Sequence, residues 1–255
     1  MIVSTDAIVL RSMKYGDTSK IVTLYSRKYG KIKVIAKGAR SAKSKYGASL
    51  EPMTHSSIVI YKTEHRELHL LSKCEIASPF HKLNDDGDKM VVGLALVEIV
   101  NMVMHDEEEN QPMYSLLLES LQSVDAAMKN PANIFLAFEL RMAEIFGYGL
   151  DIQRCSRCGR NIAGEEFRAF AFILLASGSV VCSECHKAHN TGGVRVTKAL
   201  LLSLSQLKFS PMRSAADVTL LPSTYHELLA LLQSYLKYHI EGVRTLKSLS
   251  LFTQV

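Results

Sequence analysis

The sequence of 255 residues contains no tryptophan, only six prolines and only five cysteines. It also lacks a long apolar run, since the longest, residues 90–104, contains Glu98 and Asn101. A membrane-spanning helix needs about 20 mainly apolar residues, so this run is expected to be a core helix and no membrane partner is predicted. Residues 1–17 contain no apolar segment of signal-peptide length, which predicts a cytoplasmic protein with reduced thiols.

Sequence motifs of common enzymes are also missing. There is no Gly-x-x-x-x-Gly-Lys-Ser/Thr phosphate loop, no Gly-x-Ser-x-Gly nucleophile turn and no carboxylate pair beside a plausible nucleophile. The nine histidines are scattered, and His55, His69 and His105 are expected to be surface or hydrogen-bonded residues. The chain is therefore predicted not to be an enzyme.

Negative charge is scarce near the N-terminus. The formal net charge of the chain is +5, but residues 1–45 contain only Asp6 and Asp17 against eleven Lys or Arg, a local charge of +9. A local basic surface attracts phosphate backbones whatever fold lies beneath it. The candidate DNA-binding residues are Arg11, Lys14, Lys20, Arg27, Lys28, Lys31, Lys33, Lys37, Arg40, Lys43 and Lys45.

The first eighty residues have the pattern of short strands separated by turn residues. Predicted strands cover residues 5–13, 20–26, 31–37, 57–63 and 67–74. In the third, Ile32, Val34 and Ala36 alternate with mostly charged residues, which is typical of a sheet with one packed and one solvated face. Five short strands predict a small barrel of the oligonucleotide-binding (OB) type, which binds nucleic acid on a strand face and adjoining loops.

Tyrosines lie among these cations. Tyr15, Tyr29 and Tyr46 are candidates for stacking on unpaired bases, each interaction being worth about 1–3 kcal/mol. Tyr25 fits a stacking role or a place in the barrel core equally well. A mobile loop is expected around Gly38 and the serines that follow it, and its cations are the expected main phosphate ligands: Lys37, Arg40, Lys43 and Lys45.

Four of the cysteines form two Cys-x-x-Cys pairs. Cys155 and Cys158 form the first; Cys182, 24 positions after Cys158, and Cys185 form the second. A two-residue spacer lets both thiolates of a pair face one ion, and two pairs complete the tetrahedral shell of one structural Zn²⁺. Four thiolates leave no open position for water or substrate. Gly159 is expected to take a positive φ in the tight turn after the first pair.

Other roles for these cysteines fit the chain less well. No βαβ unit of the kind that accompanies a redox Cys-x-x-Cys is evident, and disulfides are rare in the predicted compartment. His186 and His189 follow the second pair and are alternative ligands in place of one thiolate. Cys74 is predicted to be a small buried residue in a strand.

Beyond residue 88 the apolar spacing changes to that of helices, predicted over residues 91–102, 113–128, 131–146, 196–209 and 224–240. Asn130 is predicted to cap the third helix and Pro131 to begin it. The acidic residues 106–110 are predicted to form a solvated loop. The expected architecture is an OB-type barrel, residues 1–80, and an α-helical domain, residues 81–255, with a zinc-ribbon insertion at about 151–190.

Several motifs, in the same order along the chain, resemble those of the RecO family of bacterial DNA repair proteins. The N-terminal ones are Ala7-Ile8-Val9-Leu10, Tyr15-Gly16-Asp17, Ile21-Val22-Thr23-Leu24, Gly30-Lys31-Ile32 and Ala36-Lys37-Gly38-Ala39-Arg40. Gly147-Tyr148-Gly149-Leu150-Asp151, leading to Cys155-Ser156-Arg157-Cys158-Gly159, and the helical ending at 235–251 also match. Asp17 departs from the pattern, where glutamate is expected.

This resemblance implies a non-enzymatic, nucleoid-associated recombination mediator. Such a protein binds single- and double-stranded DNA, anneals complementary strands, and works with RecR to load RecA onto strands coated by single-stranded-DNA-binding protein. The family also binds the acidic, apolar-ended tail of single-stranded-DNA-binding protein, which implies a docking surface for that tail on the helical domain. Candidate residues of this surface are Arg141, Lys198 and Lys208. From the residues alone, an RNA-binding or transcription-associated zinc-ribbon adaptor remains an alternative.

Overall fold

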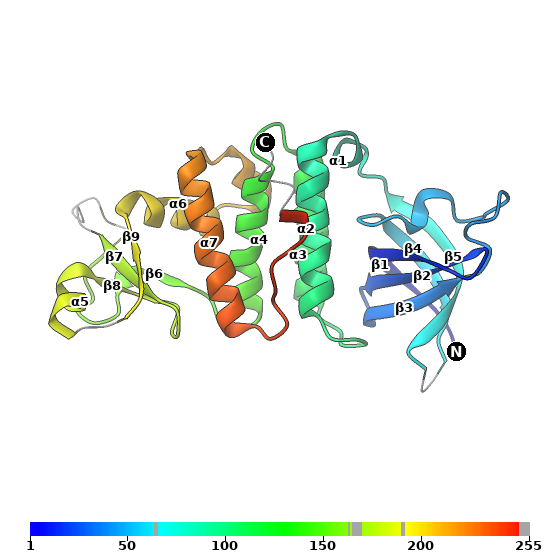
Figure 1. Ribbon diagram of the computed structural model, residues 1–255, viewed down its shortest axis with the longest axis horizontal. Coiled ribbons are helices and arrows are strands. Elements are labelled where there is room, and N and C mark those ends of the chain that lie inside the picture. Colours follow the sequence, from blue (N-terminus) through cyan, green and yellow to red (C-terminus); the bar gives the residue numbers. More distant parts are fainter. Residues whose placement is uncertain (64–65, 163, 165–169, 190–191, 250–255) are drawn as a thin grey trace. The chain divides into compact units, whose positions relative to one another are not determined.

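The computed structural model describes residues 1–63, 66–162, 164, 170–189 and 192–249 (Figure 1). The contacts divide the chain into two compact units. The first is Met1–Ala126 together with the C-terminal residues from Leu246, and the second is Ala127–Thr245. None of the helices in the described part of the chain is long and apolar enough to cross a membrane.

The first unit begins with a closed five-stranded barrel, as predicted. Its strands are β1 (Ile2–Tyr15), β2 (Ser19–Ser26), β3 (Gly30–Ala36), β4 (His55–Tyr61) and β5 (Leu68–Ser78). They close in the order β1-β2-β3-β5-β4, and every pair is antiparallel except β3 and β5. A short 3₁₀ helix, η1 (Gly47–Leu50), lies between β3 and β4.

Strand alternation produces the barrel core. Ile32, Val34 and Ala36 of β3 are buried, while the residues between them are partly exposed, because successive side chains point to opposite faces of a strand. Among the described residues, fourteen buried side chains form its hydrophobic core. Cys74 is one of them, as predicted.

Three helices follow the barrel in the first unit: α1 (His81–Asp85), α2 (Gly87–Val103) and α3 (Gln111–Ala126). The Asp86 carboxylate caps α2 by accepting the backbone N–H groups of Asp88 and Lys89. The returning C-terminal segment is held by Glu98 of α2, whose carboxylate accepts both the N–H and the hydroxyl of Ser248, at 2.9 and 2.6 Å. Helix α1 is an element that the sequence pattern did not predict.

Tyr25 is buried, but not in the barrel interior. Its side chain is fully covered, its ring lies 6.2 Å from that of Tyr114 in α3, and its hydroxyl donates to the Asn110 carbonyl at 3.3 Å. It therefore anchors helix α3 and the preceding loop to the outside of the barrel, which leaves no ring face for a base.

The second unit contains α4 (Ala132–Ile145), α6 (Lys198–Phe209), η2 (Met212–Asp217) and α7 (Pro222–His239). The predicted cap of α4 is wrong: the helix begins after Pro131, whose position makes no side-chain cap hydrogen bond. Asn130 has a φ of 43°, and its side-chain amide donates to the carbonyl of Ala216 at 3.3 Å. The backbone turn thus aims this side chain at η2, not at its own helix.

The ribbon predicted at about 151–190 lies in the second unit. Its strands β6 (Asp151–Cys155), β7 (Ala171–Leu174), β8 (Ser179–Cys182) and β9 (Val194–Val196) form one sheet in the order β6-β8-β7-β9. Helix α5 (Ser183–His189) follows β8 directly. Residues 163, 165–169 and 190 of the predicted insertion, and 250–251 of the motif-bearing C-terminal segment, lie outside the described residues.

Candidate metal centre and nucleic-acid interface

The four paired cysteines lie together. The Sγ atoms of Cys155, Cys158, Cys182 and Cys185 all lie within 4.8 Å of one another, so they could hold a metal ion. Cys155 ends β6 and Cys182 ends β8, two paired strands. Gly159, with a φ of 72°, closes the first turn by donating its N–H to the Cys155 carbonyl at 2.9 Å. This confirms the positive φ predicted there.

The electrostatics of the cluster favour a cation. The Cys182 N–H donates to Cys155 Sγ at 3.4 Å, and the Cys185 N–H donates to Cys182 Sγ at 3.5 Å. Burial raises the pKa of the Cys155 thiol, but backbone N–H donors, first that of Cys158, outweigh it and lower the pKa to about 6. Hydrogen bonding with Cys182, and then burial, raise the pKa of Cys185 to about 12. A bound cation would offset the cost of ionising these thiols, because it stabilises every thiolate.

The two histidines considered as ligands are not part of the cluster. Among the described residues the group that could hold a metal consists of cysteines alone. The ring of His186 instead stacks on Phe172, with 3.5 Å between centroids, and His189 is exposed. Four soft thiolates without a fifth donor fit a closed structural site of the kind that Zn²⁺ occupies.

The eleven predicted DNA-binding residues fall into two groups. Six make polar contacts within the protein: Lys20 with Glu51, Arg27 with Gln111, Lys31 and Lys33 with Asp106, Arg40 with Gly16 and Asp17, and Lys45 with Ser72. Five are exposed and have no such partner in the described part of the chain: Arg11, Lys14, Lys28, Lys37 and Lys43.

Some of these cations gather where two loops of the barrel meet. The Arg40 guanidinium donates to the carbonyls of Gly16 and Asp17, at 3.1 Å each. The loop after β3 is thereby fixed to the β1–β2 turn. Lys14 faces Lys20 across β1 and β2, and Lys20 faces Ala36, beside Lys37. We call Lys14, Lys37, Arg40 and Lys43 the loop-end cluster.

A second cationic region meets the acidic segment, residues 106–109, between α2 and α3. Asp106 accepts from Lys33 at 2.7 Å and lies 3.3 Å from the Lys31 ammonium. Burial opposes ionisation of Asp106, but the hydrogen bond from Lys33 and both positive charges outweigh it and lower the pKa of the carboxyl. The segment was predicted to be a solvated loop. Its side chains are exposed, but the solvated-loop prediction misses this pairing with the barrel.

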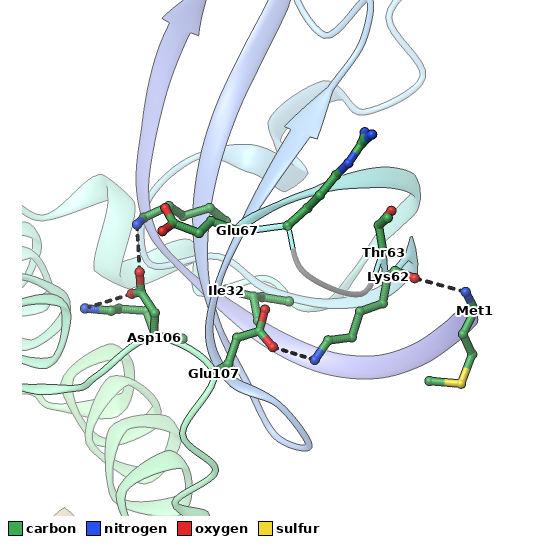
Figure 2. A pocket seen from close by; sticks show the side chains of 10 residues that line it. Met1, Ile32, Lys62, Thr63, Glu67, Asp106 and Glu107 are labelled. Atoms are coloured by element: carbon green, nitrogen blue, oxygen red, sulfur yellow. Dashed lines mark hydrogen bonds and ion pairs between the residues drawn. The ribbon is translucent and has the colours of Figure 1, made fainter.

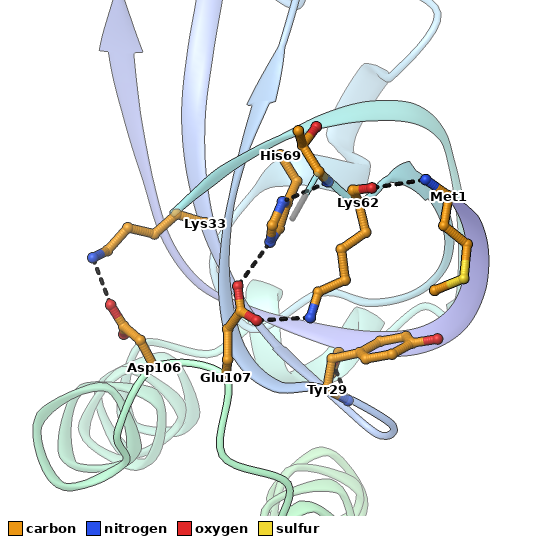
Figure 3. Close-up of polar contacts among 9 residues, drawn as sticks. Met1, Tyr29, Lys33, Lys62, His69, Asp106 and Glu107 are labelled. Carbon is orange, nitrogen blue, oxygen red and sulfur yellow. Dashed lines mark hydrogen bonds and ion pairs between the residues drawn. The ribbon is translucent and has the colours of Figure 1, made fainter. Parts of the chain in front are cut away.

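Glu107 forms a second pairing beside the first (Figure 3). Its carboxylate lies 2.7 Å from the Lys62 ammonium and 3.0 Å from Nε2 of His69, which is fully buried. The Thr63 N–H donates to His69 Nδ1 at 3.5 Å, so Nε2 carries the proton and donates to Glu107. The hydrogen bond from Lys62 is the largest cause that lowers the pKa of Glu107.

These pairings border a cavity of about 610 Å³ at the end of the barrel (Figure 2). It is lined by Met1, Lys31, Ile32, Lys33, Lys62, Thr63, Arg66, Glu67, Asp106 and Glu107. The cavity lies beside the β4–β5 connection, one of the two loops with which OB folds contact nucleic acids. Lys62 and Arg66 add positive charge there that the count over residues 1–45 did not include.

Two family models together match nearly the whole chain. The model for the "Recombination protein O N terminal" region matches residues 1–80, and that for the "Recombination protein O C terminal" region matches residues 84–250. The chain belongs to the RecO family. Its resemblance to that family, inferred from sequence motifs, is thus confirmed, and RecO membership gives the chain a role in DNA repair by recombination.

Curated relatives named "DNA repair protein RecO" match over nearly their whole length. The one from Salinibacter ruber is 30% identical over 256 residues, covering 100% of this chain and 94% of the relative. The one from Nocardioides sp. is 31% identical, covering 98% of each chain. The one from Pelotomaculum thermopropionicum is 32% identical, covering 95% of this chain and 90% of the relative.

The tyrosines considered for base stacking in this RecO family chain differ in exposure. Tyr15 is 50% exposed at the end of β1. Tyr29 is partly buried, and Lys62 lies 5.1 Å from its ring centroid. Tyr46 is only 5% exposed, and its hydroxyl donates to the Leu71 carbonyl at 2.9 Å. Tyr46 therefore belongs to the barrel core and presents no face for a base in this structure.

The candidate docking cations of the helical region are engaged in the second unit. Arg141 donates to the carbonyls of Ala137 and Ser210. Lys208 donates to the Leu150 carbonyl at 2.6 Å and pairs with Glu144 at 2.7 Å. These two side chains connect elements of their own unit, a role that their spacing on apolar helices did not reveal.

Proposed function

We propose that this chain is a recombination mediator that binds single- and double-stranded DNA through the barrel and anneals complementary strands. With RecR it assists loading of RecA onto strands coated by single-stranded-DNA-binding protein, and it catalyses no covalent reaction itself. Membership of the RecO family carries this proposal. The loop-end cluster supports it, because phosphate contacts provide affinity without specifying sequence.

The proposal assigns a separate role to each part of the chain. Residues 1–80 act as the DNA-binding domain, with Tyr15 and Tyr29 available for stacking. Residues 81–255 act as a helical domain with one structural Zn²⁺ on the four cysteines at about 151–190. The site of action is the cytoplasm, on the nucleoid. The acidic tail of single-stranded-DNA-binding protein docks on the helical domain, with Arg141, Lys198 and Lys208 as the candidate cations.

Salt dependence of oligonucleotide binding tests the proposal. If about five basic residues neutralise phosphates of single-stranded DNA, log affinity falls against log salt with a slope of roughly −3 to −4. Replacing Lys37, Arg40, Lys43 and Lys45 with alanine should flatten that slope by about 2 to 3 and weaken annealing in parallel. Unchanged affinity and slope in this variant would place the DNA site elsewhere.

Competition between DNA and RNA of the same sequence tests the alternative. An RNA-binding adaptor would prefer the RNA strand, since the 2′-hydroxyl is what distinguishes the two at a given site. The mediator should bind the DNA strand at least as tightly. A strong RNA preference would favour the adaptor.

A further inference from the structure

The acidic segment is built into the edge of the barrel as well as being ion-paired to it. Asp106 forms a parallel bridge with Lys31 of β3, and the Glu107 N–H donates to the Lys31 carbonyl at 2.8 Å. Gly30 allows this approach, because a Cβ there would collide with the carbonyl of Glu108. The backbone therefore holds the two carboxylates at fixed positions over the cations (Figure 3).

These carboxylates occupy the places that phosphate oxygens would take. Asp106 spans Lys31 and Lys33, and Glu107 contacts Lys62. Each oxygen of the Asp106 carboxylate pairs with a different lysine, and the two unesterified oxygens of a phosphodiester can pair with two lysine ammonium groups in the same way. A nucleic acid can therefore contact these three lysines only where the carboxylates have withdrawn.

The segment also carries backbone strain. Glu107 has a φ of 59°, in the left-handed region that non-glycine residues rarely occupy. Its contacts with Lys62, His69 and the Lys31 carbonyl hold it there. Loss of those contacts would let the residue relax, so the strain favours release of the segment once the contacts are broken.

We propose that Asp106 and Glu107 form an acidic clamp that covers Lys31, Lys33 and Lys62 in the free protein and is displaced by the phosphate backbone of a nucleic acid. This inference rests on the proposed function of the barrel as a DNA-binding domain. The clamp competes with DNA for the same cations, so it lowers affinity. The loop-end cluster, which the clamp does not cover, makes the first contact.

The variant D106N/E107Q removes the clamp's charge while keeping its shape and one acceptor oxygen on each side chain. The matched control is E108Q/E109Q, which removes the same charge from the same segment, where no ion pair to the barrel occurs among the described residues. Binding of a labelled oligothymidylate to the full chain is measured by fluorescence anisotropy over a range of salt concentrations. Thermal unfolding of each variant confirms that the barrel is folded.

The clamp predicts about tenfold tighter binding by D106N/E107Q at roughly 0.1 M salt, and a salt slope steeper by up to about 2, since three lysines are freed. The control should change affinity by less than about twofold. An equal gain in both variants would show a general charge effect and overturn the clamp. Weaker or unchanged binding by folded D106N/E107Q would overturn it too.

Hydrogen exchange at the Glu107 N–H separates failure of the clamp from failure of the proposed function. Oligonucleotide binding should reduce protection of this amide in the wild-type chain. If the chain binds DNA through the loop-end cluster but this amide stays protected, only the clamp is wrong. If the wild type and both variants bind no oligonucleotide, the DNA-binding function and the clamp are both wrong.

Discussion

The barrel and the ribbon are two small β structures in one chain, held together by different interactions. The barrel strands have 7 to 14 residues and surround fourteen buried side chains. The ribbon strands have only 3 to 5 residues, and two of them end at cysteines of the four-sulfur cluster. Structures this small rarely bury enough apolar area to fold alone. We therefore expect side-chain packing to stabilise the barrel and metal ligation to stabilise the ribbon.

The largest expected effect follows removal of the metal, which should unfold the ribbon and leave the barrel folded. Replacing Cys182 with alanine should reduce the zinc content of the chain nearly to zero and remove hydrogen-exchange protection from β6, β7 and β8. Structural zinc contributes roughly 10–16 kcal/mol to such small sites, whereas the barrel needs no metal and should stay protected. Elemental analysis and hydrogen exchange measure both effects.

The matched control for this prediction is Cys74→Ala, which removes a thiol from the barrel core. It should leave the metal content unchanged. A Cys182→Ala protein that keeps its zinc, or a ribbon that stays protected after the metal is lost, would contradict the comparison.

Truncating a side chain in the barrel core should destabilise the barrel and leave the ribbon with its metal. Leu24→Ala removes a fully buried side chain from the barrel and should cost about 2–5 kcal/mol in the free energy of unfolding of the first unit. The metal content should not change. Leu202→Ala, at a position 41% exposed in α6, should change stability by less than about 0.5 kcal/mol. Equal losses in urea unfolding at the two positions would argue against a packed barrel core.

A third prediction asks whether DNA affinity comes from the barrel or the ribbon. K37A/K43A removes two exposed, unpaired cations and should weaken binding about tenfold and flatten the salt slope by about 1.4, since each single-strand phosphate contact contributes about 0.7. K82A/K237A, which removes the same charge outside both modules, should have little effect. If Cys182→Ala weakens binding more than K37A/K43A does, the ribbon contributes the larger share.

The smallest expected effect is the pH dependence of the Asp106 pairing. The pKa of Asp106 in the folded chain lies below its ordinary value, so its contribution to stability is complete above about pH 4 and disappears as the pH falls through the lowered value. Asp106 faces Lys31 and Lys33. The difference in stability between wild type and D106N should be below about 1 kcal/mol at pH 7 and shrink as the pH falls below about 4. A stability difference between wild type and D106N that grows as the pH falls would contradict this prediction.

Much of the architecture could be predicted because it follows from local patterns. The alternation of Ile32, Val34 and Ala36 predicted β3 and its buried face, and the spacing of the cysteines predicted their cluster. The role of Asn130 could not be predicted, because its acceptors are the carbonyls of Ala216 in η2 and of Val218 just after it, more than eighty residues later. The identity of the bound metal, the DNA-binding residues and the partner surface stay predictions.

By itself, the sequence determined the family, the barrel, the helical region and the four-sulfur cluster, because short-range spacing and side-chain alternation encode each of them. Tertiary structure alone decided which cations are available. Lys31, Lys33 and Lys37 are equivalent in composition and strand pattern, but Asp106 pairs with the first two, and Lys37 has no partner among the described residues. That distinction depends on a segment some seventy residues away meeting β3, and Coulomb interactions depend on distance in space, not on separation along the chain.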